Sequence, residues 1–262
     1  MWTPRFCSQW PLGWRSMRHT RWNLSMIKSA MILAAGKGTR MQAQATDPPK
    51  PLTEIAGQSL LMRMVMRLEQ SGIEKIIINL HHKADVIERA MAAYAGSCEI
   101  VFSDERAALL ETGGGVKKAL PLLGDAPFLV ANGDVLWHEA DHANHALTQI
   151  MQNFKAAKMD ALLLLSDRAR ASGYDGQGDY MIDEDRRLTR RQDETEAHIF
   201  AGMQILTPAL FDGTPDVAFS LNAIYDAAQV QNRLFGHVLD GYWMHVGTPA
   251  GRAAAEAYLA AQ

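Results

Sequence analysis

From Ile27 onward, short apolar runs alternate with segments whose apolar residues recur every three or four positions. The apolar runs predict buried strands, which we place at 29–35, 75–80, 99–103, 128–132, 161–166 and 199–206. Leu61, Val65 and Leu68 share one helical face, and Gly72 is expected to end that helix. Further helices are predicted around 87–94 and over 115–123, 141–155, 221–229 and the chain from Pro249. Strands and helices in this alternation predict an α/β fold with a mostly parallel sheet flanked by helices.

The second half of the chain is less regular than the first. We predict a glycine-rich turn at 173–178, a hairpin over 180–190 and two short strands around Leu234 and Tyr242. No linker divides the chain, so we expect a single domain over 26–262. Its two parts, 26–158 and 159–262, differ in character, and the second is a smaller subregion rich in β-structure.

Residues 1–25 do not match the rest of the sequence. They contain four arginines and four of the six tryptophans, and no acidic residue precedes Asp47. We interpret this segment as a leader outside the folded domain, either disordered or lying upstream of the true start. The remainder keeps 22 of the 26 basic residues against all 29 acidic ones. An acidic body argues against nucleic-acid binding, which normally uses a basic face.

Only two cysteines, Cys7 and Cys98, are present, and neither has the spacing of a metal ligand set. Two cysteines are too few for a disulfide framework, so the sequence favours a protein of the reducing cytoplasm. No apolar run reaches 18 residues, so no membrane-spanning helix and no membrane partner are expected. The chain is expected to act as a monomer or a small homo-oligomer.

The strongest chemical signal directly follows the first predicted strand, in the segment Leu33-Ala34-Ala35-Gly36-Lys37-Gly38-Thr39-Arg40-Met41. Small residues let backbone N–H groups approach an anion, and Lys37 and Arg40 add charged donors. This combination suits a triphosphate. It is neither a Walker A loop nor a complete G-x-G-x-x-G, because Met41 occupies the third glycine position. The alternative interpretation is a tight turn between strand and helix without a ligand.

Two further residues suit the chemistry of phosphate. Lys50 lies between Pro49 and Pro51, which stiffen its segment, and a lysine held in this way supplies a point charge to phosphate oxygens. Asp134 follows a predicted parallel strand, and α/β folds bind ligands at the carboxyl ends of such strands. Mg²⁺ prefers one or two carboxylates together with phosphate oxygens. The alternatives are an exposed loop lysine and an aspartate that caps a helix or turn.

These segments resemble the signature of the sugar-phosphate nucleotidyltransferases, the nucleoside-diphosphate-sugar pyrophosphorylases. The resemblance rests on L-A-A-G-x-G-T-R-M followed by K-P-L, on Glu111-Thr112-Gly113-Gly114-Gly115 and on Asn132-Gly133-Asp134, and it covers about 27–261. It implies a Rossmann-like sheet with a nucleotide-binding first half and a sugar-binding second half. With Lys118-Ala119-Leu120-Pro121 added, the chain is most similar to members that use UTP and N-acetylmuramate 1-phosphate.

The resemblance also implies roles for individual residues. The catalytic residues would be Arg40, Lys50 and Asp134. The nucleotide would be bound by Ala34, Ala35, Gly36, Lys37, Gly38, Thr39, Arg40, Lys50, Glu111, Thr112, Gly113, Gly114 and Asn132, with the base against the backbone of the two glycines. The sugar would be bound by Asp167, Gly178, Gly202 and Asn222, and an arginine of the pair Arg190-Arg191 would replace a phosphate-facing lysine. The alternative for that pair is a solvated charge pair in a hairpin.

One residue departs from the family pattern. Where the family reads W-x-D-V-G-T-P, this chain has His245 in place of the aspartate that is the second metal ligand. Imidazole is a poor ligand for Mg²⁺ and a better one for Mn²⁺. Three interpretations stay open: Mg²⁺ held by Asp134 and phosphates alone, a softer ion bound by His245, or a histidine that only hydrogen-bonds the substrate phosphate.

The implied reaction is attack of a sugar 1-phosphate oxygen on the α-phosphorus of a nucleoside triphosphate, which releases pyrophosphate. Positioning and charge neutralisation suffice for such a transfer, so no Ser or Cys nucleophile is needed. Guanylyl transfer to mannose or heptose 1-phosphate is the alternative within the class. A glycosyltransferase would need a D-x-D motif where this chain has Asn132-Gly133-Asp134. A catalytically silent nucleotide or sugar-phosphate sensor is a third interpretation, motivated by His245.

Overall fold

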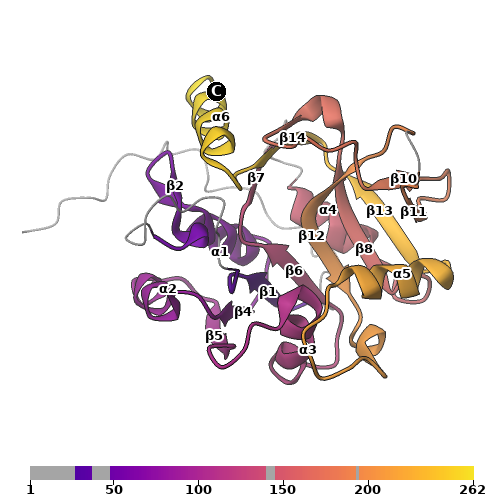
Figure 1. Cartoon of the computed structure of the whole chain (residues 1–262), viewed down its shortest axis with the longest axis horizontal. Helices are drawn as coiled ribbons and strands as arrows, with labels where there is room; N and C mark the ends of the chain where they lie inside the picture. The colour runs from indigo at the N-terminus through magenta and orange to yellow at the C-terminus, as the bar shows by residue number, and fades with distance from the viewer. Residues whose placement is uncertain (1–26, 37–47, 140–144, 193–194) are drawn as a thin grey trace, which may run out of the picture.

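The computed structural model describes residues 27–36, 48–139, 145–192 and 195–262. Its centre is a seven-stranded sheet in the order β13-β8-β12-β6-β1-β4-β5 (Figure 1). The strands are β1 (Ser29–Leu33), β4 (Lys75–Leu80), β5 (Glu99–Asp104), β6 (Phe128–Asn132), β8 (Ala161–Ser166), β12 (Ile199–Leu206) and β13 (Leu234–Val238). The leader predicted over 1–25 lies outside the described residues.

All neighbouring strands pair in parallel except at β12, which runs antiparallel to β6 on one side and to β8 on the other. The carboxyl ends of β1, β4 and β6 therefore meet at one edge of the sheet, next to the amino end of β12. Sheets of this kind bind ligands in the crevice outside the carboxyl ends of their strands. The prediction of a mostly parallel sheet is confirmed.

Helices cover both faces of the sheet, because successive residues of a strand point to opposite sides. On one face, Ile76 and Ile78 of β4 join a core with α1 (Leu60–Gln70), α2 (Ala84–Met91) and α4 (Ala146–Asn153). On the other face, Ile77 joins a core with α3 (Glu111–Leu123) and α5 (Asn222–Val230). The three isoleucines are completely buried. Burial of each such side chain stabilises the fold by about 1.5–3 kcal/mol.

A smaller sheet lies beside the central one. In it, β14 (Gly241–His245) pairs with β7 (Val135–Glu139) and β9 (Ala171–Ser172). Helix α6 (Pro249–Ala260) packs on this sheet, where Ala255 shares a small core with Leu136 and Met244. The remaining elements are the hairpins β2 (Glu54–Ile55) with β3 (Gln58–Ser59) and β10 (Tyr180–Ile182) with β11 (Leu188–Arg190), and the 3₁₀ helices η1 (Lys50–Leu52), η2 (Arg168–Arg170) and η3 (Pro208–Phe211).

The predicted strands at 75–80, 128–132, 161–166 and 199–206 are confirmed to the residue. Other boundaries differ, and two of them concern the site. The first strand ends at Leu33 because the next two backbone amides bond to the side chain of Asn79. Helix α3 begins at Glu111, four residues before the predicted start, and strand β7 was not predicted. In the second half, β8, β12 and β13 extend the same central sheet, so the two parts share one framework.

Among the described residues, no helix combines the length and apolar character that a membrane crossing needs. Cys98 is a free, buried thiol, and burial raises its pKa.

An ion pair between the half-buried Arg67 and the buried Glu139 ties β7 to α1. The guanidinium of Arg67 donates to both carboxylate oxygens of Glu139 at 2.9 Å and to the carbonyl of Trp137 at 2.8 Å. Glu139 also accepts from the indole N–H of Trp137 at 2.9 Å and from the amide of Ala146. Burial raises the pKa of Glu139, but the charge of Arg67 and these hydrogen bonds outweigh burial and hold the pKa below its ordinary value.

We expect Arg67→Leu to lower the free energy of unfolding by about 3 kcal/mol at pH 7, because it leaves the Glu139 carboxylate buried without a cation. A carboxylate whose pKa is lowered in the folded state stabilises the fold at pH values above its ordinary pKa of 4.5. This contribution is lost as the pH falls through the lowered pKa. The difference between wild type and variant should therefore shrink at pH 4. Urea unfolding at both pH values measures it.

Arg252→Leu is the matched control, since Arg252 pairs with Glu256 on the exposed surface of α6. It should change the free energy of unfolding by no more than about 0.5 kcal/mol. An Arg67→Leu effect as small as that of the control, or one equally large at pH 4, would contradict the importance of the buried pair.

Candidate functional site

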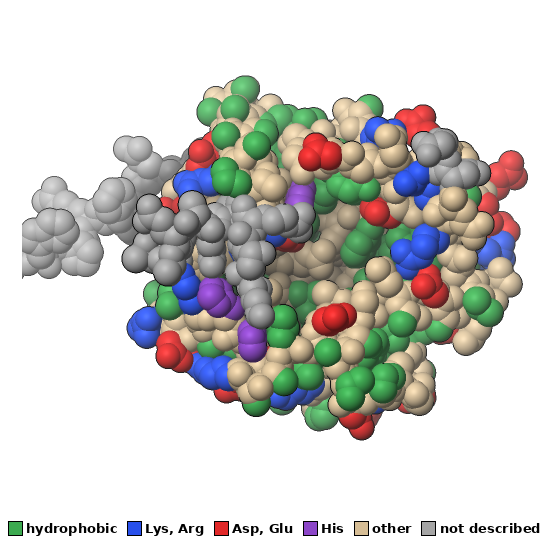
Figure 2. All heavy atoms as spheres, viewed as in Figure 1, with side chains coloured by type: hydrophobic (Ala, Val, Ile, Leu, Met, Phe, Trp, Pro, Cys, Tyr) green, Lys and Arg blue, Asp and Glu red, His purple; other side chains and the backbone are tan. Residues whose placement is uncertain are grey.

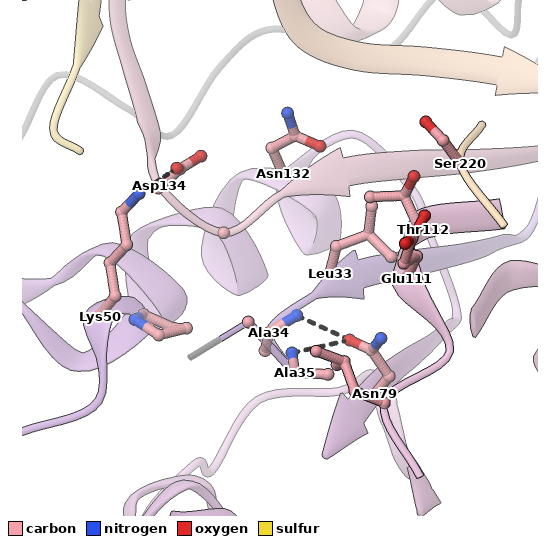
Figure 3. Close-up of a pocket in the computed structure, with 14 residues that line it drawn as sticks. Leu33, Ala34, Ala35, Lys50, Asn79, Glu111, Thr112, Asn132, Asp134 and Ser220 are labelled. Atoms are coloured by element: carbon pink, nitrogen blue, oxygen red, sulfur yellow. Dashed lines mark hydrogen bonds and ion pairs between the residues drawn. The ribbon is translucent and has the colours of Figure 1, made fainter. Parts of the chain in front are cut away.

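A cavity of 490 Å³ opens at the edge of the sheet where β1, β4 and β6 end (Figure 3). The face drawn in Figure 2 is hollowed near its centre. The cavity is lined by Leu33, Ala34, Ala35, Gly36, Lys50, Pro51, Asn79, Leu109, Glu111, Thr112, Asn132, Gly133, Asp134 and Ser220. Eight of the residues predicted to bind nucleotide or catalyse the reaction are therefore brought together around one space, although they come from four separate stretches of sequence.

Asp134 lies between β6 and β7 with its carboxylate turned to the cavity. Its Oδ2 forms an ion pair with Lys50 Nζ and lies 3.5 Å from Nε2 of His245. Its carbonyl accepts from the amide of Val246 at 3.0 Å, which ties it to the end of β14. Burial raises the pKa of this carboxyl group, but the contact with His245 and the charge of Lys50 outweigh burial and hold the pKa of Asp134 well below its usual range. The site therefore keeps an ionised carboxylate at neutral pH.

His245 is held in one orientation from several sides. Its ring stacks on that of Trp243, with centroids 6.0 Å apart and planes 3° from parallel. Nδ1 lies 3.1 Å from the carbonyl of Gly173, and a carbonyl only accepts, so Nδ1 carries the hydrogen. Nε2 faces Oδ2 of Asp134 and, when it carries no hydrogen, can bind a cation held by that carboxylate. A Cβ at Gly247 would collide with the ring, so this glycine leaves the space that the imidazole fills.

The pair of donors fits a divalent cation. Two ligands of one octahedral ion with bonds of about 2.1 Å lie about 3 Å apart, close to the 3.5 Å between Asp134 Oδ2 and His245 Nε2. Two protein donors leave the other positions to phosphate oxygens and water, as Mg²⁺ and Mn²⁺ sites commonly do. The described residues contain no cluster of three or more His, Cys, Asp or Glu that could hold a metal by protein ligands alone.

Asn79 lines the cavity and was missed by the sequence analysis. Its Oδ1 accepts from the amides of Ala34 at 2.7 Å and Ala35 at 3.2 Å (Figure 3). Ala34 and Ala35 were predicted to bind the nucleotide, and both line the cavity while their amides bond to this side chain. The available signal was a polar residue near the end of the apolar strand 75–80. Lys37, Gly38, Thr39 and Arg40, the rest of the predicted phosphate loop, lie outside the described residues.

The opposite wall of the cavity begins α3. Glu111 and Thr112 line the cavity, and Thr112 Oγ1 accepts from the amide of Leu221 at 2.9 Å. Gly113 and Gly114 do not line it. Their amides donate to the carbonyl of Phe219 at 2.8 and 3.1 Å. This differs from the expectation that a base lies against their backbone: they let the first turn of α3 approach the chain at 217–219.

The four residues expected to bind sugar do not line the cavity. Gly202 adjoins it, since a Cβ there would lie 3.1 Å from Asn132 Nδ2. Asp167 follows β8 and pairs with His198 at 3.1 Å. Gly178 packs against Ala197, the neighbour of that histidine. These three positions follow the edge of the sheet away from the cavity.

The remaining predicted residues have structural partners. Asn222 begins α5 at the surface, and its amide bonds to Ser220 Oγ at 3.2 Å. Arg190 pairs with Asp226 at 2.8 Å and lies over the ring of Tyr180. Arg191 donates from Nε to the carbonyl of Gly178 at 3.1 Å. The contacts of Arg190 favour the alternative of a charge pair in the hairpin over a phosphate ligand.

The sequence model of the family described as MobA-like NTP transferase domain matches residues 30–172. N-acetylmuramate alpha-1-phosphate uridylyltransferase of Caulobacter vibrioides is 40% identical over 238 residues, which are 89% of this chain and 97% of that protein. The protein of the same name from Neisseria meningitidis is 35% identical over 221 residues, 84% of this chain and 93% of that protein.

The fold is also shared with solved structures. The crystal structure of HddC from Yersinia pseudotuberculosis superposes with a TM-score of 0.71 and 24% sequence identity. The match covers 89% of this chain and 100% of that one.

We expect Lys50→Ala to raise the pKa of the Asp134 carboxyl group by about one to three pH units. The substitution removes a positive charge that favours the ionised form, while burial still disfavours it. A ¹³C NMR titration of the aspartate carboxyl groups measures it. Lys75→Ala is the control. Lys75 pairs at 3.5 Å with Glu99 at the opposite edge of the sheet, where β4 and β5 begin, so this substitution should leave the pKa of Asp134 unaffected. An unchanged Asp134 titration in Lys50→Ala would show that the ion pair does not set this pKa.

Proposed function

The chain belongs to the MobA-like NTP transferase family, and we propose that it transfers the uridylyl group of UTP to N-acetylmuramate 1-phosphate. The products are the UDP-sugar and pyrophosphate. The observation that carries this proposal is the cavity in which Lys50 and Asp134 face the segment 34–36 across the carboxyl edge of the sheet. The two relatives at 40% and 35% identity, each named for this reaction, support the choice of substrates.

The reaction needs one P–O bond to form and one to break. A phosphate oxygen of the sugar 1-phosphate attacks the α-phosphorus of UTP, and the bond to the β-phosphate oxygen breaks as pyrophosphate leaves. The enzyme contributes position and positive charge, because the transferring group carries negative charge throughout. Lys50, only 13% exposed along its side chain, places an ammonium group in the cavity. We assign Lys37 and Arg40 to the triphosphate on the basis of their spacing in the loop.

A divalent cation, when bound, neutralises charge on the phosphates. Asp134 and Nε2 of His245 are the residues that would hold it, and Mg²⁺ is the ion that we propose for the reaction. The nitrogen donor suits Mn²⁺ better than Mg²⁺, so we expect Mn²⁺ to support the reaction as well. Lys50 pairs with the carboxylate of Asp134, so its charge would add to that of the cation in neutralising the phosphates.

The sugar would extend from Asp134 along the edge of the sheet toward β12 and β8. Gly202 and Asp167 occupy that direction, which supports their assignment to the sugar. Proteins named for guanylyl transfer to mannose 1-phosphate match the chain less closely than the two uridylyltransferases. The buried free thiol of Cys98 agrees with a cytoplasmic enzyme.

Purified protein given Mg²⁺, UTP and N-acetylmuramate 1-phosphate should release pyrophosphate, and GTP with mannose 1-phosphate should react at least tenfold more slowly, a difference of about 1.4 kcal/mol in transition-state binding. Asp134→Asn should lower kcat about a hundredfold or more, because the cation loses its carboxylate. A coupled pyrophosphate assay measures both.

Asp240→Asn serves as the control, since Asp240 pairs with Arg170 at the exposed surface. Its kcat should equal that of the wild type. No pyrophosphate from any nucleotide and sugar 1-phosphate would refute the proposed function, and full activity of Asp134→Asn would remove this residue from the site.

A further inference from the structure

The buried amide of Asn79, at the wall of the cavity, and the buried carboxylate of Glu105 next to it take no part in the chemistry described so far. Asn79 is the last residue but one of β4 and is 2% exposed, and Glu105 follows β5 and is 1% exposed. A carboxylate so deeply buried is expensive unless hydrogen bonds replace its water. The partners of these two side chains therefore indicate what the pair does.

The pair joins the two walls of the cavity. One wall is the segment 34–36 after β1, which we call the phosphate wall, and the other is the segment 109–112, which we call the base wall. Asn79 Oδ1 accepts from two amides of the phosphate wall, those of Ala34 and Ala35. Asn79 Nδ2 donates to Glu105 Oε1 at 2.8 Å, and Glu105 Oε2 accepts from the amide of Leu110 in the base wall at 3.2 Å.

The surroundings hold this bridge in place. The backbone of Glu105 is fixed on β4, since its amide donates to the carbonyl of Leu80 at 2.7 Å. Its carbonyl lies 2.8 Å from Nδ1 of His81. The third glycine of the triplet makes the necessary space: a Cβ at Gly115 would lie 2.8 Å from Glu105 Oε1 and 3.1 Å from Asn79 Nδ2.

We propose that Asn79 and Glu105 are positioning residues that set the spacing between the phosphate wall and the base wall. The inference rests on the proposed function in taking a nucleoside triphosphate as the ligand that spans these walls. A change in their spacing would misplace the α-phosphorus relative to Asp134 and Lys50. Misplacement by about 1 Å is enough to cost a hundredfold in rate.

The hydrogen-bond pattern fixes which side chain must donate. The amides of both walls donate, so each side chain must offer them an oxygen. The two side chains can then bond to each other only if one of them also has an N–H, and Asn79 Nδ2 supplies it. Asn79→Asp keeps the acceptor for the two amides but sets a second carboxylate against Glu105. Glu105→Gln keeps a single carbonyl oxygen where two donors, from Asn79 and Leu110, need one each.

The double exchange Asn79→Asp/Glu105→Gln restores the pattern with the roles reversed. The new carboxylate accepts from the phosphate wall and from the new amide N–H₂, and the new amide oxygen accepts from Leu110. The net charge of the pair is unchanged. Recovery in the double variant is therefore specific to a bridge between these two residues, because neither exchange alone supplies it.

The experiment measures kcat, the KM for UTP, the KM for N-acetylmuramate 1-phosphate, the Kd of UTP by calorimetry and the urea midpoint. We expect each single exchange to raise the KM and Kd for UTP about tenfold and to lower kcat, while the KM for the sugar phosphate changes less than about threefold. The double variant should return to within about threefold of the wild type. Gly115→Ala, which presses a methyl group on Glu105, should act like a single exchange.

Ser29→Ala is the control for a merely structural role. Ser29 Oγ donates to the carbonyl of Leu123 at 2.8 Å, a buried hydrogen bond at the opposite end of β1. This variant should lower the urea midpoint and leave every kinetic constant unchanged. If a single-exchange variant does not fold, the UTP constants of Gly115→Ala still test the inference, since this substitution alters neither member of the pair.

Unchanged UTP constants in the single exchanges and in Gly115→Ala would overturn the inference, as would a double variant no better than the worse single one. A wild type that binds UTP but releases no pyrophosphate would refute the proposed function alone. In that case the Kd of UTP across the same variants still decides for or against the bridge.

Discussion

The ionised carboxylate of Asp134 lies at the end of β6 among segments from three distant parts of the chain. A partly buried carboxylate stays charged only if cations or donors compensate for the lost water. Lys50 arrives from η1 and His245 from β14, so the site exists only when the small sheet β7-β14-β9 has formed beside the central sheet. Folding of the second half thereby completes a site most of whose other residues belong to the first half.

The fold supplies this site by placing polar groups where strands end. β1, β4 and β6 contribute the segment 34–36, Asn79 and Asp134 to one edge. Their apolar residues fill the layers on both faces of the sheet. The core is thus apolar, while the edge beside the cavity carries hydrogen-bonding groups.

Much of the fold follows from the sequence because each buried strand is a short apolar run between turn residues, as in β4 and β8. Lys50 and Asp134 were also predicted, since their places next to prolines and after a strand carry local information. The start of α3 was not predicted, because three successive glycines disfavour a helix and only their contacts with 217–219 and Glu105 stabilise it.

Other parts of the site depend on partners that are distant in the sequence. Asn79 looks like one polar residue in an apolar strand, and nothing near it in the chain indicates that it bonds to Ala34 and to Glu105. Arg190 matched a family position, yet Asp226 on α5 engages it. Strand β7 was missed because its pairing with β14 lies a hundred residues away along the chain. Contacts of this kind are decided by tertiary packing.

The most direct test of this account is a crystal structure of the chain with a non-hydrolysable UTP analogue and Mn²⁺. We predict the triphosphate beside Lys50 and the segment from Gly36, the ion on Asp134 and His245 Nε2, and the uracil between residues 109–112 and Ser220. Nucleotide bound elsewhere, or an ion that contacts neither Asp134 nor His245, would contradict the account.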